Sequence, residues 1–447
     1  MNRRAWIRGA PGACAHVLRT AMRARVAVAL CLSAVACAAV AVGSEPHAPL
    51  DLPPAALVER ALSEHPSVLA AQAGIAVGQA EQARYRAGPY EYSVRVGAQQ
   101  RQVTVAPTHR FGEWGVALEK PFRLPAKRRI DGELGQNAVT VSEQAYGDAL
   151  HEAGRALLAL WFAWIREAEQ VRQWQKQVEV LQGQLDIVDK RVKAGDAPQL
   201  EVVLAQSALA QAKSAFRQAQ LREQQAATNL NKRFPQIVLP PKPTLLEPTP
   251  PTQDLDYWRQ QVLARSHRLA LARAEVKRAD LSAARAQSDL TPDPTVGIHY
   301  DSERGGEERI VGLSLSIPLP GGARRATAHA LEAQASMASQ REAATLAAVG
   351  AETDNLYAGA VAAYQSWQNI QAAAVGMARS ADLMSRAYAI GEANLTDVLT
   401  ARRQAIDARL AATLAQIDAA ETHYRLLLDA HQLWRFSREG QAADRLP

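Results

Sequence analysis

The chain of 447 residues contains the same pattern twice. Residues 115–206 align with residues 312–402 at an offset of 196 or 197, so that the turn sequence Gly195–Val202 falls on Gly391–Val398. Solenoid proteins repeat every few tens of residues, so a period this long excludes that architecture. The sequence therefore predicts one half-protein that was duplicated and fused.

Both copies contain the same predicted segments in the same order. A helical stretch (54–87 or 255–290) precedes two short alternating segments, a helical stretch of about 70 residues, a glycine-containing turn and a last helical stretch of about 35–40 residues. The predicted boundaries are repeat 1 at 44–233 with a β-hairpin near 92–121, a Pro-rich linker at 234–254, repeat 2 at 255–435 with a β-hairpin near 295–318, and a C-terminal tail at 436–447.

The first 43 residues have the composition of a secretory signal peptide. They carry six arginines but no lysine or acidic residue, and an apolar run, Val26–Val42, leads to the small residues Ala41–Gly43. Met22 is an alternative start, and a single membrane anchor is the alternative interpretation, although the run is short for a span. Without this segment Lys and Arg fall from 51 to 45, equal to the 45 Asp and Glu, which removes the basic charge that nucleic-acid binding needs.

All three cysteines lie in this N-terminal segment, at Cys14, Cys31 and Cys37. A chain cleaved after Gly43 would therefore form no disulfide and offer no thiolate for metal binding or catalysis. The sequence Ala34–Cys37 also resembles a lipoprotein cleavage box, in which Cys37 would become the acylated first residue, although alanine stands where leucine is usual.

The long helical stretch of the first copy carries a seam of apolar residues spaced three and four apart. The seam continues for about five heptads, which predicts a left-handed coiled coil. Seventy helical residues would extend about 105 Å, far more than a globular core requires. The seam residues are Leu157, Trp161, Trp164, Ala168, Val171, Trp174, Val178, Leu181, Leu185, Val188 and Val192.

The short segments alternate between apolar and small or polar residues, as β-strands with two different faces do. Trp114, Val116 and Leu118 alternate with residues such as Gly115, and the pattern recurs over Val311–Ile317. A strand of 9–11 residues can cross a bilayer when it is tilted, and this alternation is typical of transmembrane β-barrels. A half-buried sheet in a soluble protein is the alternative.

Two hairpins supply four strands per chain, too few to close a barrel with a lumen. An open sheet edge is very costly in lipid, because its backbone groups find no water there. If the strands span a membrane, several chains must therefore close one barrel, with twelve strands from three copies or eight from two. The helical stretches would then continue the barrel as a tube.

Three motifs, in an order that the duplication repeats, resemble those of the TolC-like outer-membrane efflux channels of Gram-negative bacteria. They are Ala61–Pro66 in the first helix, Ser316–Gly322 before Arg324 and Arg325, and Tyr388–Leu399 at the second helical turn. The resemblance covers essentially the whole mature chain.

This resemblance implies a mainly α-helical fold with a small β part and a homotrimer whose strands form a twelve-strand barrel in outer-membrane lipid. Its helices would form a tunnel across the periplasm that docks on a periplasmic adaptor and an inner-membrane pump, expected to be of the RND type. The chain would be a passive, gated duct without a cofactor. The heavy-metal cation efflux branch is one assignment within the family, and the sequence does not predict the exported substrate.

The resemblance also places the periplasmic entrance at the two helical turns. Asp397 occupies the family's gate position, whereas Thr400 stands where a second acidic residue is usual. Glu201 is the counterpart of Asp397 in the first copy, and Asp196 and Glu392 follow the turn glycines. A ring of carboxylates would concentrate cations at a narrow mouth.

Helix capping is the alternative role of these acidic residues, because the first turn of a helix favours negative charge. Gly195 and Gly391 are interpreted as structural turn residues that adopt positive φ. Pro121 and Pro318 are expected where strand gives way to helix.

No enzyme motif and no metal site is predicted. The sequence has no nucleophile elbow, phosphate loop or zinc-protease motif, and residues such as His109, His151 and His299 are isolated along the chain. His423 and His431 are eight residues apart, too far to share an ion without other ligands. The alternative function is a periplasmic coiled-coil adaptor or scaffold that does not enter the membrane, although such adaptors have one helical hairpin rather than two.

Overall fold

The computed structural model describes residues 51–434. The predicted signal peptide, Cys37 and the predicted tail at 436–447 therefore lie outside the described residues. Within them the two copies have the same order of elements. The first comprises α2 (Ala55–Ser63), α3 (Pro66–Ala87), β1 (Ser93–Val103), β2 (His109–Pro121), α4 (Pro125–Lys193) and α5 (Gln199–Arg233). The second comprises α6 (Leu255–Arg265), α7 (His267–Ser288), β3 (Thr295–Glu303), β4 (Glu308–Ser316), α8 (Gly322–Ala389) and α9 (Leu395–Asp429), with a short 3-10 helix, η1 (Arg304–Gly306), added between β3 and β4.

The predicted mainly helical fold with a small β part is confirmed. Helices α4 and α8 have 69 and 68 residues, and α5 and α9 have 35 each, close to the predicted lengths. Among the helices of residues 51–434, none combines the length and the apolar character needed to cross a membrane.

The first helical stretch of each copy differs from the prediction, because it is broken in two. Between α2 and α3 the chain breaks before Pro66, which has no N–H to continue a helix, and the His65 side chain accepts a hydrogen bond from the backbone N–H of Ser67. Between α6 and α7, the Ser266 hydroxyl accepts from the N–H of Leu269 and caps the new helix. Each copy therefore begins with two helices.

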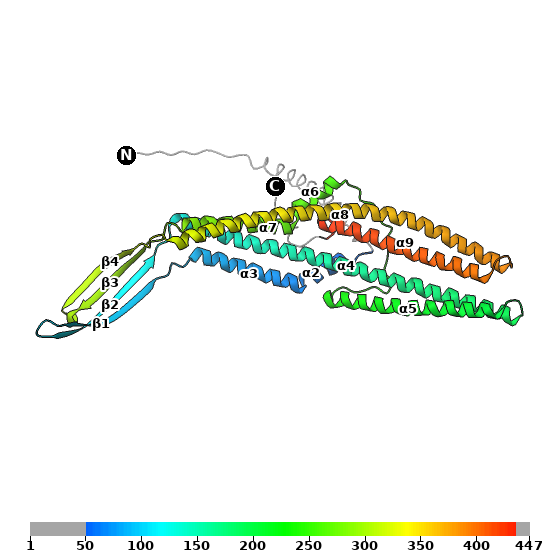
Figure 1. The fold of residues 1–447 in the computed structure, drawn as a ribbon, viewed down its shortest axis with the longest axis horizontal. Coiled ribbons are helices and arrows are strands. Elements are labelled where there is room, and N and C mark those ends of the chain that lie inside the picture. The colour runs from blue at the N-terminus through cyan, green and yellow to red at the C-terminus, as the bar shows by residue number, and fades with distance from the viewer. Residues whose placement is uncertain (1–50, 435–447) are drawn as a thin grey trace, which may run out of the picture. The chain divides into compact units, whose positions relative to one another are not determined.

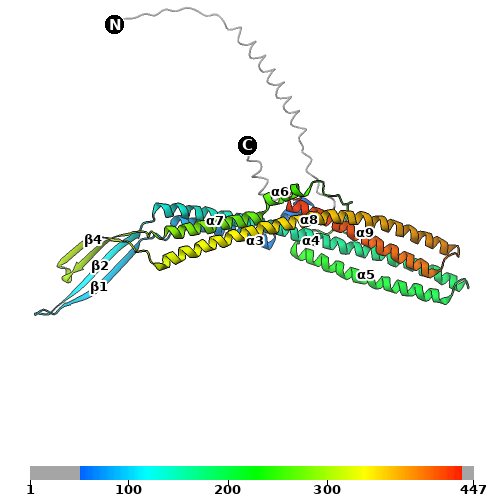
Figure 2. The ribbon, with the colours of Figure 1, turned by 45° about the horizontal axis from the view of Figure 1, so that its top comes forward.

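Helix α4 is the central element of residues 51–434. It packs on α3 and α5 of its own copy and on α7 and α9 of the second copy, and α8 packs on α7 and α9. The sheet lies at one end of these helices, and the α4–α5 and α8–α9 turns lie at the other (Figures 1 and 2). The seam predicted for α4 is buried or half-buried along its whole length.

The largest hydrophobic core lies around the middle of α4, where α2, α4 and α9 meet. Phe162 is fully buried and stacks on Tyr424 of α9, with ring centroids 5.9 Å apart. The linker between the copies contributes to this core through Phe234 and Ile237, which are 0% and 2% exposed. The linker has no regular secondary structure, but its first residues are packed rather than free.

The strands of the described residues form one antiparallel sheet in the order β1-β2-β3-β4. Val116 of β2 lies opposite Val96 of β1 and Tyr300 of β3, and Tyr300 lies opposite Val311 of β4. Strands β1 and β4 are the outer strands, and each pairs along one edge only.

Candidate functional site

The register of the sheet gathers the apolar side chains of all four strands on one face. The rows run through Val96, Val116, Tyr300 and Val311, and through Val94, Leu118, Ile298 and Leu313. In the single chain this face is open, with Val311 72% and Leu313 82% exposed. A continuous apolar surface of this kind marks contact with lipid or with another protein.

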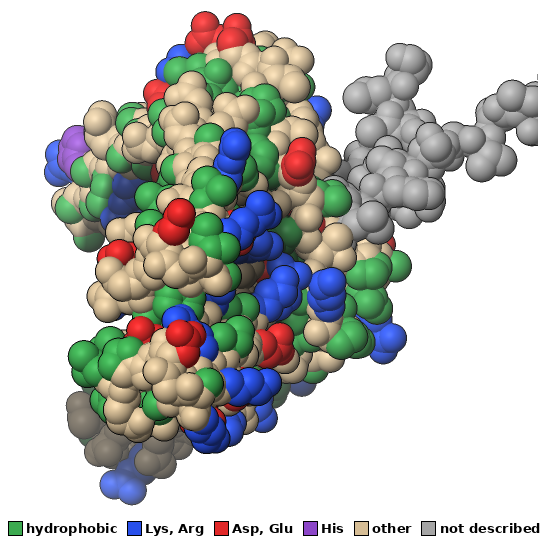
Figure 3. Space-filling view, turned by 90° about the vertical axis from the view of Figure 1, so that its right-hand side faces the viewer, with side chains coloured by type: hydrophobic (Ala, Val, Ile, Leu, Met, Phe, Trp, Pro, Cys, Tyr) green, Lys and Arg blue, Asp and Glu red, His purple; other side chains and the backbone are tan. Residues whose placement is uncertain are grey.

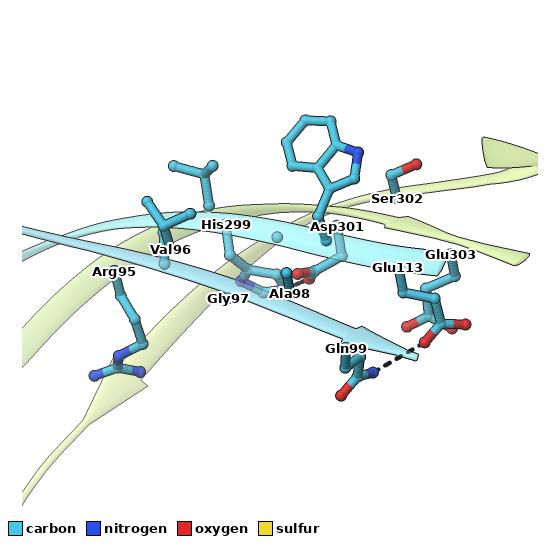
Figure 4. Close-up of a pocket in the computed structure, with 14 residues that line it drawn as sticks. Arg95, Val96, Gly97, Ala98, Gln99, Glu113, His299, Asp301, Ser302 and Glu303 are labelled. Carbon is cyan, nitrogen blue, oxygen red and sulfur yellow. Dashed lines mark hydrogen bonds and ion pairs between the residues drawn. The ribbon is translucent and has the colours of Figure 1, made fainter. Parts of the chain in front are cut away.

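The opposite face is polar and its charges are paired. Arg101 lies 3.0 Å from Glu113 and 2.7 Å from Glu303, so one guanidinium joins β1, β2 and β3. Arg95 and Glu119 pair at 3.1 Å. Figure 4 shows Arg95, Gln99 and Glu113 on one side of the strands and Val96 on the other. The predicted two-faced character of the strands therefore extends across the whole sheet.

The chain passes from strand to helix near the two predicted prolines. Pro121 is the last residue of β2, and Pro318 lies between β4 and α8. Beside the first junction, Lys127 of α4 is 1% exposed and its Nζ lies 3.0 Å from Asp289 and 3.1 Å from Asp293. This buried cation joins the first copy to the second.

The two helical turns lie at the end of the helices away from the sheet. Gly195 and Gly391 have φ values of +80° and +81°, which side chains with a Cβ rarely adopt, so both positions require glycine. Figure 3 looks onto this end and shows acidic and basic side chains interspersed with exposed apolar ones.

Near the turns, all four long helices meet in a small apolar cluster. Val188 of α4, Val202 of α5, Tyr388 of α8 and Leu395 and Val398 of α9 are its buried members. The cluster therefore joins the ends of the two copies within one chain.

A polar link crosses from α8 to α5 at the edge of this cluster. The Tyr388 hydroxyl donates to a Glu201 carboxylate oxygen at 2.8 Å, and the Arg191 guanidinium lies 4.7 Å from the centre of the Tyr388 ring. Burial and the neighbouring Glu201 carboxylate both raise the pKa of the Tyr388 hydroxyl, which keeps it a donor at neutral pH. Arg191 in turn donates to the Asp196 carboxylate at 3.0 Å.

The acidic residues predicted for this end have different surroundings. Glu201 is half-buried and joined to Tyr388, whereas Glu392 and Thr400 are exposed. Asp397 is exposed, and its backbone N–H donates to the Asn394 side chain that caps α9, at 2.9 Å. The structure thus supports a role for Asp397 in the first turn of a helix and brings Glu201 into contact with Tyr388 of the second copy.

Tyr388 and Arg191 were not among the predicted site residues. From the sequence, Tyr388 was named only as the first residue of the Tyr388–Leu399 motif, and no local pattern pointed to a role for its hydroxyl. Arg402 was also missed; its Nε donates to the Ser385 hydroxyl at 3.2 Å, and burial lowers the pKa of its guanidinium. For Tyr388, the signal available in the sequence was an aromatic residue close to the polar turn at Gly391.

His151 is isolated along the sequence, but the fold brings other histidines and a carboxylate beside it. Its ring stacks on His431 with centroids 5.0 Å apart, His431 lies 5.3 Å from His267, and Asp429 lies 3.2 Å from His151. These residues meet because the end of α9 and the start of α7 pack on α4. Across residues 51–434, no group of three or more His, Cys, Asp or Glu side chains is arranged to hold a metal ion.

Comparison with known proteins identifies the class of this fold. Residues 258–428 match the family model described as outer membrane efflux protein. No curated protein sequence matches the chain significantly. The predicted resemblance to the TolC-like outer-membrane efflux channels is confirmed.

Solved structures of outer-membrane channels match over most of both chains. The CmeC channel of Campylobacter jejuni superimposes with a TM-score of 0.71 at 14% identity, covering 87% of this chain and 89% of CmeC. VceC of Vibrio cholerae gives a TM-score of 0.69 at 16% identity over 85% of this chain and 96% of VceC. The open state of the MtrE channel of Neisseria gonorrhoeae gives 0.60 at 16% identity over 86% and 90%. At these identities the likeness shows a shared fold.

Proposed function

Since residues 258–428 match the outer membrane efflux protein family and the described fold is that of outer-membrane channels, we propose that this chain is one subunit of a trimeric efflux channel. Its four strands close with those of two further copies into a twelve-strand barrel in outer-membrane lipid. Its long helices form the wall of a tunnel in the periplasm. The channel is passive, and an inner-membrane pump supplies the energy through a periplasmic adaptor.

The two-faced sheet is the observation that carries this proposal. Its apolar face runs across all four strands and is exposed in the single chain, and its polar face carries paired charges. Lipid satisfies the first face and water in a lumen satisfies the second. The outer strands β1 and β4 each leave one edge unpaired. Pairing β4 of one copy with β1 of the next removes the edges that lipid does not tolerate.

The helical turns are the proposed gate, at the periplasmic entrance. The apolar cluster of Val188, Val202, Tyr388, Leu395 and Val398 and the hydrogen bond from Tyr388 to Glu201 hold the four helix ends together. Opening the entrance separates α8 and α9 from α4 and α5, which exposes this cluster and breaks that bond. Asp397, Asp196 and Glu392 lie on exposed positions around the turns, where their charge attracts cations.

An efflux role requires partners that select and drive the cargo. A pump of the RND type and its adaptor are the proposed partners, and the heavy-metal cation branch is the part of the family to which we propose to assign the chain. The polar sheet face mixes both signs of charge with glycine and glutamine, which fits a permissive duct rather than a narrow filter.

The second candidate function is a periplasmic scaffold that never enters the membrane. The long helices alone would fit either function. The exposed apolar sheet face favours the channel, because a protein that stays in water would leave Leu313, Val311 and their neighbours uncovered.

Reconstitution of the purified full chain tests the proposal. We expect the protein to fractionate with outer membranes, to be trimeric in mild detergent and to produce discrete conductance steps in a planar bilayer. A monomer that stays soluble without detergent and gives no conductance would refute the channel and favour the scaffold.

Asp397→Ala tests the charge at the proposed entrance. We expect weaker block by polyvalent cations added on the helical side, because one exposed carboxylate per subunit is lost there. Asp407→Ala is the matched control, since its carboxylate is also exposed on α9 but lies ten residues farther from the turn. Equal block in Asp397→Ala and Asp407→Ala would mean that the Asp397 carboxylate acts in the first turn of α9 and does not attract cations to the entrance.

A further inference from the structure

Two glycines on the polar face of the sheet lie directly beneath polar side chains of β3. Gly115 of β2 is opposite Asp301, and Gly312 of β4 is opposite His299. A Cβ at Gly115 would overlap the Asp301 carboxylate, and one at Gly312 would overlap the His299 ring. Both side chains therefore lie over positions where the neighbouring strand has no side chain.

The two side chains also lie beside each other. His299 Nε2 and Asp301 Oδ2 are 3.8 Å apart, and the side chains are 33% and 39% exposed. Figure 4 shows both on the same side of the strands as Arg95 and Gln99. The imidazole thus lies over Gly312 and the carboxylate over Gly115, so both side chains lie along the surface of the sheet and do not project away from it.

The same two glycines are equivalent in the duplicated sequence, since Gly115 falls on Gly312 at the offset of 197. The side chains that cover them both come from β3, in the second copy. In the first copy the residue opposite Gly115 on β1 is Gly97, and a Cβ there would meet nothing within 4 Å. The glycines that Asp301 and His299 cover therefore lie on β2 and β4, the two strands that flank β3.

We propose that Gly115 and Gly312 hold Asp301 and His299 flat on the wall and thereby determine the open cross-section and the charge of the strand part of the duct. The inference rests on the proposed channel function, which puts the polar face in the lumen. With a methyl group at Gly115, the Asp301 carboxylate must turn away from the sheet. It would then stand in the lumen, where it narrows the path and attracts cations.

Glycine in a strand often serves close approach of the backbone, which is the alternative explanation. At Gly115 and Gly312 the nearest atoms are the ends of side chains, and at Gly115 the closest backbone atom is 3.4 Å from the position of a Cβ. A rotated side chain can relieve the overlap without a change in the strand pairing. The alternative predicts instead that the strands separate.

The test compares Gly115→Ala with Gly97→Ala in the reconstituted trimer. Gly97→Ala is the matched control, because it adds the same methyl group on the same face of the adjacent strand, opposite Gly115, without overlap. We expect Gly115→Ala to lower single-channel conductance relative to the control and to raise the cation-to-anion permeability ratio, because the displaced carboxylate narrows the path and adds negative charge to it. Recordings are also made with Tyr388→Phe added, so that the helical end does not limit the current.

Removing the displaced group should reverse the effect. In the double variant Gly115→Ala with Asp301→Ala we expect conductance to return to the control value and the cation preference to fall below it. A crystal structure of Gly115→Ala should show Asp301 rotated away from β2 with the strand register unchanged. Gly312→Ala provides a second variant, in which the His299 ring is displaced instead.

Equal conductance and selectivity of Gly115→Ala and Gly97→Ala would overturn the inference, and so would a structure with separated strands and Asp301 in place. A native protein without any conductance would overturn the channel function itself. The two failures are distinct, because the first leaves the native conductance intact.

Discussion

Tyr388→Phe is the sharpest test of how the helix ends are held together. The substitution keeps the ring, and hence the apolar cluster with Val188 and Val398, but removes the hydroxyl that donates to Glu201 at 2.8 Å. The Glu201 carboxylate of α5 then loses the hydrogen bond from Tyr388 of α8. We expect the closed arrangement of the helix ends to weaken without a loss of fold.

The size of the effect follows from the chemistry of the bond. A hydrogen bond to a charged group contributes about 1.5–3 kcal/mol, and because Glu201 is only half-buried we take the lower end, about 1.5 kcal/mol per chain. That free energy corresponds to roughly a tenfold shift in an equilibrium constant. If three copies open together, the shift is about 10³-fold in favour of the open state.

The assay is single-channel recording of the open probability, with Tyr364→Phe as the control. Tyr364 lies on the same helix, and its hydroxyl accepts from Gln368 of that helix, at 3.0 Å, so the loss of this bond should not affect the contact between helices. Because burial and Glu201 raise the pKa of the Tyr388 hydroxyl, the hydroxyl keeps its proton at neutral pH, and at alkaline pH the link is lost as the pH rises through the folded-state pKa. Equal open probabilities for Tyr388→Phe, Tyr364→Phe and the native protein would refute the reasoning.

Three further variants test the core, the junction and a half-buried carboxyl. Phe162→Ala should destabilise the fold by about 3–5 kcal/mol in chemical denaturation, whereas Phe122→Ala, which removes a ring that is 51% exposed, should cost far less; similar losses would contradict the assigned core. Lys127→Met removes the buried ammonium group from Asp293 and from Asp289, which keeps its ion pair with Arg285, and should cost about 1–3 kcal/mol. Because Lys127 helps to lower the pKa of Asp289, the difference from the native protein should shrink as the pH falls and Asp289 is protonated; a difference that does not depend on pH would count against the pairing. Burial and the nearby Glu152 raise the pKa of Asp148, so ionisation of this carboxyl destabilises the folded state as the pH rises. Asp148→Asn should therefore increase the melting temperature at pH 7, and the increase should shrink toward pH 4. An equal increase at both pH values would argue against this explanation.

The sequence was sufficient to predict the elements of the fold. Their periodicity is local, because a helical seam such as that of α4 and a strand such as Val311–Ile317 show their pattern within one segment. The duplication then fixed their order, and the turn glycines Gly195 and Gly391 identified the helix ends through a backbone conformation that other residues avoid. The breaks before Pro66 and at Ser266 were readable in principle, since proline and capping serine mark helix starts.

The contacts that give the candidate site its chemistry depended on the tertiary structure. Tyr388 and Glu201 are 187 residues apart, and His151 and Asp429 are 278 apart, so no local pattern relates them. The positions of Asp301 over Gly115 and of Lys127 among carboxylates likewise depend on which strands and helices become neighbours. A sequence pattern shows which face of each segment is buried and which is exposed. Contacts between distant side chains are decided only when the segments pack, because the free energy of packing depends on many residues together.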